Sequence, residues 1–123
     1  MATIRSLDSL VGTRVVNLEG EDLGKIEEIM LDLEHGTVAY AVLSFGGLLG
    51  FGDKLFAVPW ESLSVDQGNE RMFLNVPKAR LKDAKGFDKF EWPNDADPAL
   101  RMEAPPEDLS PGAPPRSRTA VAP

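Results

Sequence analysis

The alternation of apolar and polar residues divides the chain, as far as residue 76, into short strands. Turns that are polar or rich in glycine separate most of them, at the spacing typical of a small β-barrel. The third strand is apolar on both faces, so we expect it to be central in the sheet and covered on both sides. The six predicted strands are Thr13–Leu18, Leu23–Leu33, Thr37–Phe45, Leu55–Val58, Ser64–Asp66 and Arg71–Val76.

The second predicted strand is long and contains one break in its alternation. Ile29, Leu31 and Leu33 recur at every second position, which is the period of a strand with one buried face. Ile26 is out of phase with Ile29. A β-bulge near Glu27-Glu28 would place both isoleucines on the core side, and bulges bend the strands of small barrels.

Short helical segments flank these strands. Ser6 is suited to cap a single helical turn that Gly12 closes, and Pro77 opens a helix that continues to Ala84. We therefore expect an all-β fold, a small and strongly bent β-barrel of about six strands with a short C-terminal helix, over residues 1–93.

The composition changes from residue 94 onward. Six of the ten prolines lie in the last twenty residues, and such a segment buries too little apolar surface to offset the entropy of ordering it. We therefore expect a disordered, proline-rich tail over residues 94–123. Phe87, Phe90 and Trp92 precede this tail, and we expect them to dock on the barrel.

A glycine-rich loop with an apolar tip joins the third and fourth strands. Its spacing lacks the third glycine of a dinucleotide-binding loop and does not match the P-loop pattern, and no helix pattern follows it. The loop therefore favours a chain reversal over phosphate binding. Leu48, Leu49 and Phe51 occupy its tip, where polar residues are usual. They either fold back as a lid on the core or dock on a partner.

Composition and charge exclude several classes of protein. The net charge is −7, and such a chain repels phosphates and anionic lipid, so we expect no direct contact with nucleic acid. The absence of cysteine removes disulfides, thiolate catalysis and cysteine metal sites, and it fits a cytoplasmic protein. No apolar run approaches the roughly 20 residues of a membrane helix, and the first ten residues lack the apolar region of a signal peptide.

Side chains that could carry chemistry are few and scattered. His35 is the only histidine and follows Glu34 in a predicted turn, which favours a turn residue over a general base or metal ligand. The serines lack the context of a nucleophile elbow. We therefore expect no catalytic residue, no cofactor and no metal site, and we expect that the protein is not an enzyme.

Contacts with a partner protein are the better functional interpretation. The carboxylates of the first hairpin, among them Glu27 and Glu28, lack the spacing of a calcium loop and form either a solvated face or a contact for a basic partner. Trp60 either seals the end of the barrel or anchors a partner. The candidate contact residues are Leu48, Leu49, Phe51, Trp60, Glu27 and Glu28.

Five short motifs, in this order along the chain, resemble the PRC-barrel family. They cover roughly residues 5–90. The resemblance implies a small bent barrel whose shared theme is protein–protein contact without a known catalytic site. Members include the cytoplasmic domain of the photosynthetic reaction-centre H subunit and the C-terminal domain of the ribosome maturation factor RimM. The motifs are Leu10-Val11-Gly12, Asp22-Leu23-Gly24-Lys25-Ile26, Gly46-Gly47-Leu48-Leu49-Gly50, Val58-Pro59-Trp60 and Leu81-Lys82-Asp83-Ala84 with Gly86-Phe87.

Two functional hypotheses follow. The first is a non-catalytic interaction module that forms a homodimer or docks on a protein or membrane-associated complex, because a modest core and an apolar loop favour association. The alternative is an assembly-factor role like that of the reaction-centre H subunit or RimM, or a barrel that binds a small ligand near His35 or the acidic hairpin. The H subunit has a membrane helix ahead of its barrel and RimM has a domain there, so we expect neither specific role to transfer.

Overall fold

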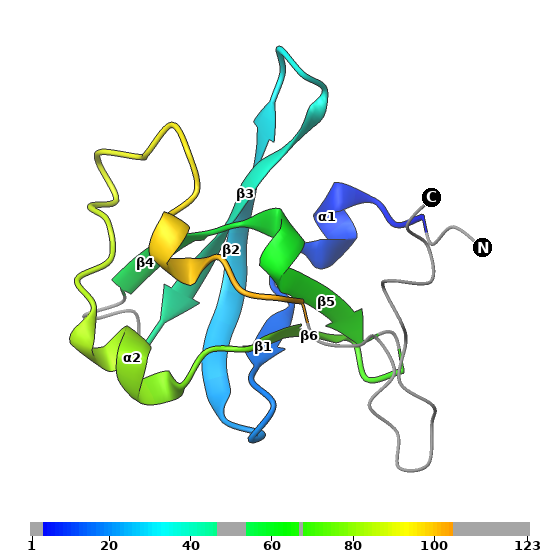
Figure 1. Ribbon diagram of the computed structural model, residues 1–123. Helices are drawn as coiled ribbons and strands as arrows, with labels where there is room; N and C mark the ends of the chain where they lie inside the picture. The colour runs from blue at the N-terminus through cyan, green and yellow to red at the C-terminus, as the bar shows by residue number, and fades with distance from the viewer. Residues whose placement is uncertain (1–3, 47–53, 67, 105–123) are drawn as a thin grey trace.

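The structure, a computed structural model, describes residues 4–46, 54–66 and 68–104. Over these ranges the chain forms a strongly curled sheet flanked by short helical segments (Figure 1). The strands are β1 (Arg14–Val16), β2 (Asp22–Asp32), β3 (Thr37–Phe45), β4 (Lys54–Val58), β5 (Leu63–Asp66) and β6 (Arg71–Leu74). The helical segments are α1 (Leu7–Leu10), η2 (Trp60–Ser62), α2 (Lys78–Asp83) and η3 (Pro98–Leu100).

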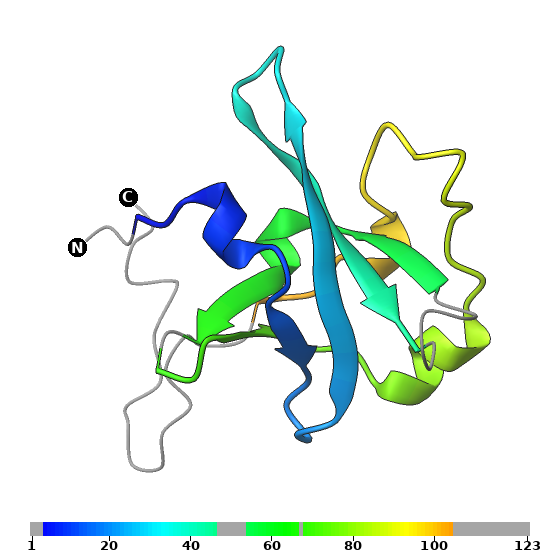
Figure 2. The same ribbon diagram turned by 180° about the vertical axis from the view of Figure 1, so that it is seen from behind.

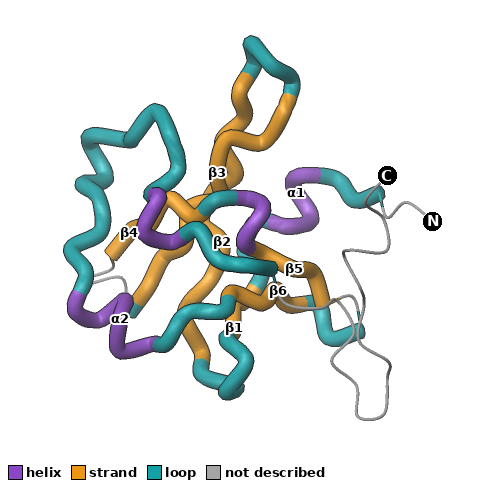
Figure 3. The backbone as a smooth tube through the Cα atoms, in the orientation of Figure 1, coloured by secondary structure: helices purple, strands orange, loops and turns teal. Residues whose placement is uncertain are grey.

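The six strands form one sheet in the order β4-β3-β2-β1-β6-β5. Neighbouring strands are antiparallel except β1 and β6, which are parallel. The view from behind shows β2 and β3 crossing the molecule together, with β1 beside β2 (Figure 2). The tube view shows how short most strands are and how much of the chain connects them (Figure 3). The predicted small, bent, all-β fold is thus confirmed.

The β-bulge that we expected in the second strand is present. Between one pair and the next, β2 advances from Ile26 to Glu28 while β3 advances by a single residue. Glu27 is therefore the extra residue, and Ile26 and Ile29 are both buried, as the broken alternation predicted. A second irregularity lies on β3, where Ala39 is the extra residue. Bulges of this kind increase the local twist and bend.

Two apolar clusters lie on opposite faces of the sheet. The main cluster lies inside the curl and includes residues from every strand, α1, α2 and η3, either buried or packed against it. A smaller cluster of Tyr40, Val42 and Ala57 lies on the other face of β3 and β4, where Phe87 and Ala96 pack against it. The third strand therefore lies between β4 and β2, one place in from the edge of the sheet, and it is buried on both faces over residues 40–45, as its two apolar faces predicted.

The packed part of the chain extends beyond the boundary that we expected at residue 94. Asp97 donates its N–H to the Ala57 carbonyl at 2.8 Å. Leu100 is only 3% exposed and belongs to the main cluster, and Met102 donates its N–H to Ser62 Oγ at 2.8 Å. The sequence-based boundary rested on the average composition of residues 94–123. That average is dominated by proline, so it did not indicate the short apolar segment around Leu100. Residues 105–123 lie outside the described part of the chain.

The aromatic residues after α2 behave in different ways. Phe87 packs against the smaller cluster and meets Trp92 edge to face, with 5.4 Å between ring centroids. Phe90 is 84% exposed, with the Lys89 ammonium 5.2 Å from its ring centroid. The expectation of docking on the barrel is therefore confirmed for Phe87 and wrong for Phe90.

Candidate functional site

The β2–β3 hairpin projects from the body of the molecule (Figures 1 and 2). β1 pairs with β2 only over residues 22–25, and β4 pairs with β3 only over residues 41–45 and its own residues 54–58. Beyond these points β2 and β3 pair with each other, as far as Asp32 and Thr37, and with no other strand of the described residues. We call residues 30–39 the arm.

An apolar stripe runs out of the core along the arm. Ile29 is 6% exposed, Leu31 is 51% exposed and Leu33 is 87% exposed. Val38 lies opposite Leu31 and packs against the main cluster. The alternation predicted one buried face along this strand. That prediction is right for Ile29 and wrong for Leu31 and Leu33, because the described residues that cover the inner part of the arm do not extend over these two leucines.

The outer leucines are therefore contact candidates that the sequence analysis missed. A contiguous apolar surface that leaves the core and meets water is typical of a binding site. The signal that could have found it is the length of β2 and β3, because strands of 11 and nine residues extend beyond β1 and β4, the three- and five-residue strands that flank the pair.

Acidic side chains surround this apolar stripe. Glu27 and Glu28 are exposed at its base, and Glu34 is exposed in the turn. The ion pairs that form within the described residues include none of these three carboxylates. The three carboxylates at the base and in the turn of the arm are therefore not compensated by ion pairs within the described residues.

The turn of the arm is organised by Asp32. Its Oδ1 accepts the N–H groups of Glu34 at 3.0 Å and His35 at 3.1 Å, and its Oδ2 lies 2.7 Å from His35 Nδ1. These hydrogen bonds, first that of the His35 ring and then those of the backbone, lower the pKa of Asp32. His35 is thus an exposed turn residue, as expected, and the described residues contain no cluster that could hold a metal ion.

The first prediction concerns this pair. His35→Asn should leave the fold unchanged, because Asn suits turns, and should raise the pKa of Asp32 part of the way to its ordinary value, since the backbone donors remain. A carboxyl group whose pKa is lowered on folding stabilises the folded state at pH values above its unfolded-state pKa. This stabilisation is lost as the pH falls through the folded-state pKa. An NMR titration of the Asp32 carboxyl carbon measures the shift. An unchanged Asp32 pKa would contradict the role assigned to the ring.

The remaining sequence candidates fall in different places. Trp60 lies in η2, is half-buried against the main cluster and belongs to a turn that contacts β3. Leu48, Leu49 and Phe51 lie outside the described residues, so the lid and interface alternatives for that loop both stay open.

A pocket of about 280 Å³ lies between β4 and the segment after α2. Its walls are mainly apolar, and the Asp97 carboxylate at its edge already accepts the N–H of Ala99 at 2.9 Å. His35 does not line it, so the ligand-binding hypothesis based on His35 gains no support from this pocket. The lining residues are Leu55, Phe56, Ala57, Gly86, Phe87, Pro93, Asp95, Ala96, Asp97 and Pro98.

Two glycines of the five motifs lie where one stretch of backbone passes very close to another. Gly24 has φ +130°, and a Cβ there would lie 2.0 Å from the Ser44 carbonyl oxygen. Gly86 has φ +74°, and a Cβ there would lie 2.7 Å from the Leu55 carbonyl oxygen. Neither position tolerates a side chain without a backbone shift. The close approach of the backbone to β3 and β4 therefore explains why glycine occupies these two motif positions.

A strongly bent small β-barrel with a projecting β2–β3 hairpin is the class of domain that this arrangement defines. The family model described as "PRC-barrel domain" matches residues 3–81, which is more than half of the chain. The chain therefore belongs to the PRC-barrel family. None of the helices among the described residues is both long and apolar enough to cross a membrane.

Among solved structures, the chain is similar to a putative 16S ribosomal RNA processing protein, RimM, from Pseudomonas aeruginosa. The two share 18% sequence identity with a TM-score of 0.43, and the match covers 61% of this chain and 45% of that one. The chain thus spans less than half the length of this structural relative. A comparison with curated proteins finds no match.

Proposed function

We propose that this protein is a non-catalytic interaction module that docks on another protein through its arm. The observation that carries this proposal is the stripe from Ile29 to Leu33, which begins in the core and ends 87% exposed. Burying Leu31 and Leu33 against a partner would remove apolar surface from water, at roughly 25 cal/mol per Å². The arm also ends in a turn fixed by Asp32, so it costs little ordering entropy when it binds.

The distribution of titratable groups supports a binding role over a catalytic one. The described residues whose pKa departs from the ordinary range are Glu21, Asp32, Asp66 and Tyr40. The three carboxyl groups have hydrogen-bond partners that explain a lowered pKa, and burial explains the raised pKa of Tyr40. A catalytic acid or base would instead combine a perturbed pKa with a cleft.

Site-specific crosslinking tests the proposal directly. A photo-reactive phenylalanine replaces Leu33 in the full chain, and the matched control replaces Leu18, which is 47% exposed in the turn between β1 and β2. We expect protein adducts from position 33 and far fewer from position 18, in native lysate or with the purified protein. Equal yields at the two positions, or none at either, would contradict docking through the arm.

A pair of substitutions provides the second prediction. For this test the photo-reactive residue is moved to Thr37, which is also on the arm. Leu31→Ser combined with Leu33→Ser should then abolish the adducts. The free energy of unfolding should change by less than about 1.5 kcal/mol, since both side chains are already exposed. Leu18→Ser should leave adduct formation intact. Thermal unfolding establishes that the variants fold. Adducts that survive the double substitution would show that these leucines do not make the contact.

A further inference from the structure

The charges of this chain are separated into two regions. Residues 19–34 contain seven acidic residues and one basic residue, whereas residues 78–89 contain five basic residues and two acidic ones. The first region is β2 with the turns at its ends, including the outer half of the arm. The second is α2 and the segment that follows it. An acidic chain with a net charge of −7 thus carries one surface of the opposite sign.

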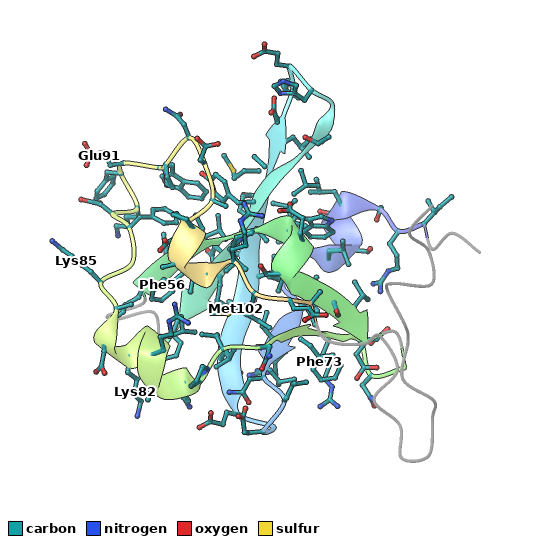
Figure 4. The ribbon with its side chains drawn as sticks, viewed as in Figure 1. Phe56, Phe73, Lys82, Lys85, Glu91 and Met102 are labelled. Carbon is teal, nitrogen blue, oxygen red and sulfur yellow. The ribbon has the colours of Figure 1, made fainter. Side chains whose placement is uncertain are left out.

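The cations of the second region are displayed to solvent. Lys82 and Lys85 are exposed and point away from the body at and after α2 (Figure 4). Neither belongs to an ion pair formed within the described residues. Lys82 and Lys85 are not required as hydrogen-bond donors to the carbonyls at the end of α2. The Lys54 ammonium donates to the Leu81 and Ala84 carbonyls instead, at 3.3 and 2.9 Å.

An exposed aromatic ring adjoins these cations in the chain. Phe90 is 84% exposed, and the Lys89 ammonium lies over its ring. We call Lys82, Lys85, Lys89 and Phe90, which are exposed one after another along α2 and the segment that follows it, the basic patch. It combines positive charge with apolar area, as the arm combines negative charge with exposed leucines, so the two surfaces match in both properties.

We propose that the occupant of the arm is the basic patch of a second copy of this chain. This inference rests on the proposed function, since it identifies the partner of the same arm. Contact between two arms would bring acidic residues of one copy, among them Glu28 and Glu34, close to those of the other, which is repulsive. In the arm-to-patch contact, Leu33 packs on Phe90 and the lysine stems, while the carboxylates meet the ammonium groups.

The contact uses different surfaces of the two molecules, and the inference is that two molecules close it as a pair. In a twofold dimer the arm of each molecule meets the patch of the other, so the contact is made twice and leaves no unpaired arm. This dimer differs from one based on the glycine loop, because it requires two charged regions that lie far apart in the sequence.

Charge reversal in the full chain tests the inference by sedimentation equilibrium. The arm variant carries Glu34→Lys in the turn of the arm and Glu28→Lys at its base, and the patch variant carries Lys82→Glu and Lys85→Glu. Each alone should raise the dimer dissociation constant at least tenfold, because like charges then face each other. An equimolar mixture of the two should restore dimers, since both contacts again pair opposite charges. Glu70→Lys with Glu103→Lys makes the same charge change as the arm variant at exposed positions outside both charged regions and should leave the dissociation constant within about threefold.

The outcomes separate this inference from the proposed function. A single species of 13.4 kDa for the unmodified chain at every concentration would overturn the dimer, whereas adducts of other proteins at position 33 would still support docking through the arm. A dimer that the patch variant leaves unchanged, or a mixture that fails to associate, would also overturn it. A dimer insensitive to every arm substitution, with no adducts at position 33, would overturn both.

Discussion

Gly24→Ala will unfold most of the molecules at room temperature or lower the free energy of unfolding by about 4 kcal/mol or more. Gly24 lies on β2 opposite Val15 of β1, with φ +130°. A Cβ at this position would lie 2.0 Å from the Ser44 carbonyl oxygen and 3.3 Å from the Phe45 Cα. Both obstacles are backbone atoms at the end of the neighbouring strand β3, so relief requires the sheet itself to move.

Gly20→Ala is the matched control for this variant. Gly20 also has a positive φ, +82°, but a Cβ there would meet nothing within 4 Å. Gly20→Ala should therefore lower the free energy of unfolding only through the unfavourable backbone conformation, by about 1–2 kcal/mol. Urea unfolding measures both variants. Similar losses at the two positions would show that the close approach of β2 to β3 is not what requires glycine at position 24.

A chain that ends at Asp97 should lose about 4 kcal/mol of folding free energy relative to a chain that ends at Ala104. The deletion removes Leu100 from the main cluster and Met102 from its side. It also removes the hydrogen bond from Met102 to Ser62 and the ion pair between Arg101 and Glu61. The proline-rich composition of residues 94–123 predicts almost no loss of folding free energy on this truncation, whereas the structure predicts a large one. The experiment therefore distinguishes the two predictions.

Point substitutions identify the cause of that loss. Leu100→Ala in the full chain should reproduce much of it, about 2–5 kcal/mol, because a cavity opens in the core. Ala99→Ser, at the exposed neighbouring position, should be close to neutral. Equal denaturation midpoints for the chains ending at Asp97 and Ala104 would mean that the segment after Asp97 adds nothing to the core.

The local elements were predictable because their causes are local. Turn residues and alternating apolar positions predicted all six strands, and the phase break between Ile26 and Ile29 predicted the bulge at Glu27. Pro77 marked the start of α2, and the described helix runs over Lys78–Asp83. The ends of strands were less certain, as β1 spans Arg14–Val16 instead of the longer predicted range, because pairing with neighbours sets where a strand ends.

The candidate site was only half visible in the sequence. The exposed carboxylates Glu27 and Glu28 were correctly placed on the first hairpin. The alternation predicts Leu31 and Leu33 on the buried face, since it indicates which residues share a face and not how far the covering layer extends. The lysine-rich segment after Pro77 predicts a helix, and its positive charge in an acidic chain is also a signal for a second surface.

By itself, the sequence determined the strands, the turns, the charge and the family motifs, all of which depend on neighbours within a few residues. Only the tertiary structure decided which apolar faces are covered. Residues 86–97 cover the outer face of β4 and Leu100 completes the interior, whereas the arm extends past its neighbours and keeps Leu33 in water. Covering layers come from segments far apart in the chain, and the loop-closure and packing energies that select them have no local pattern.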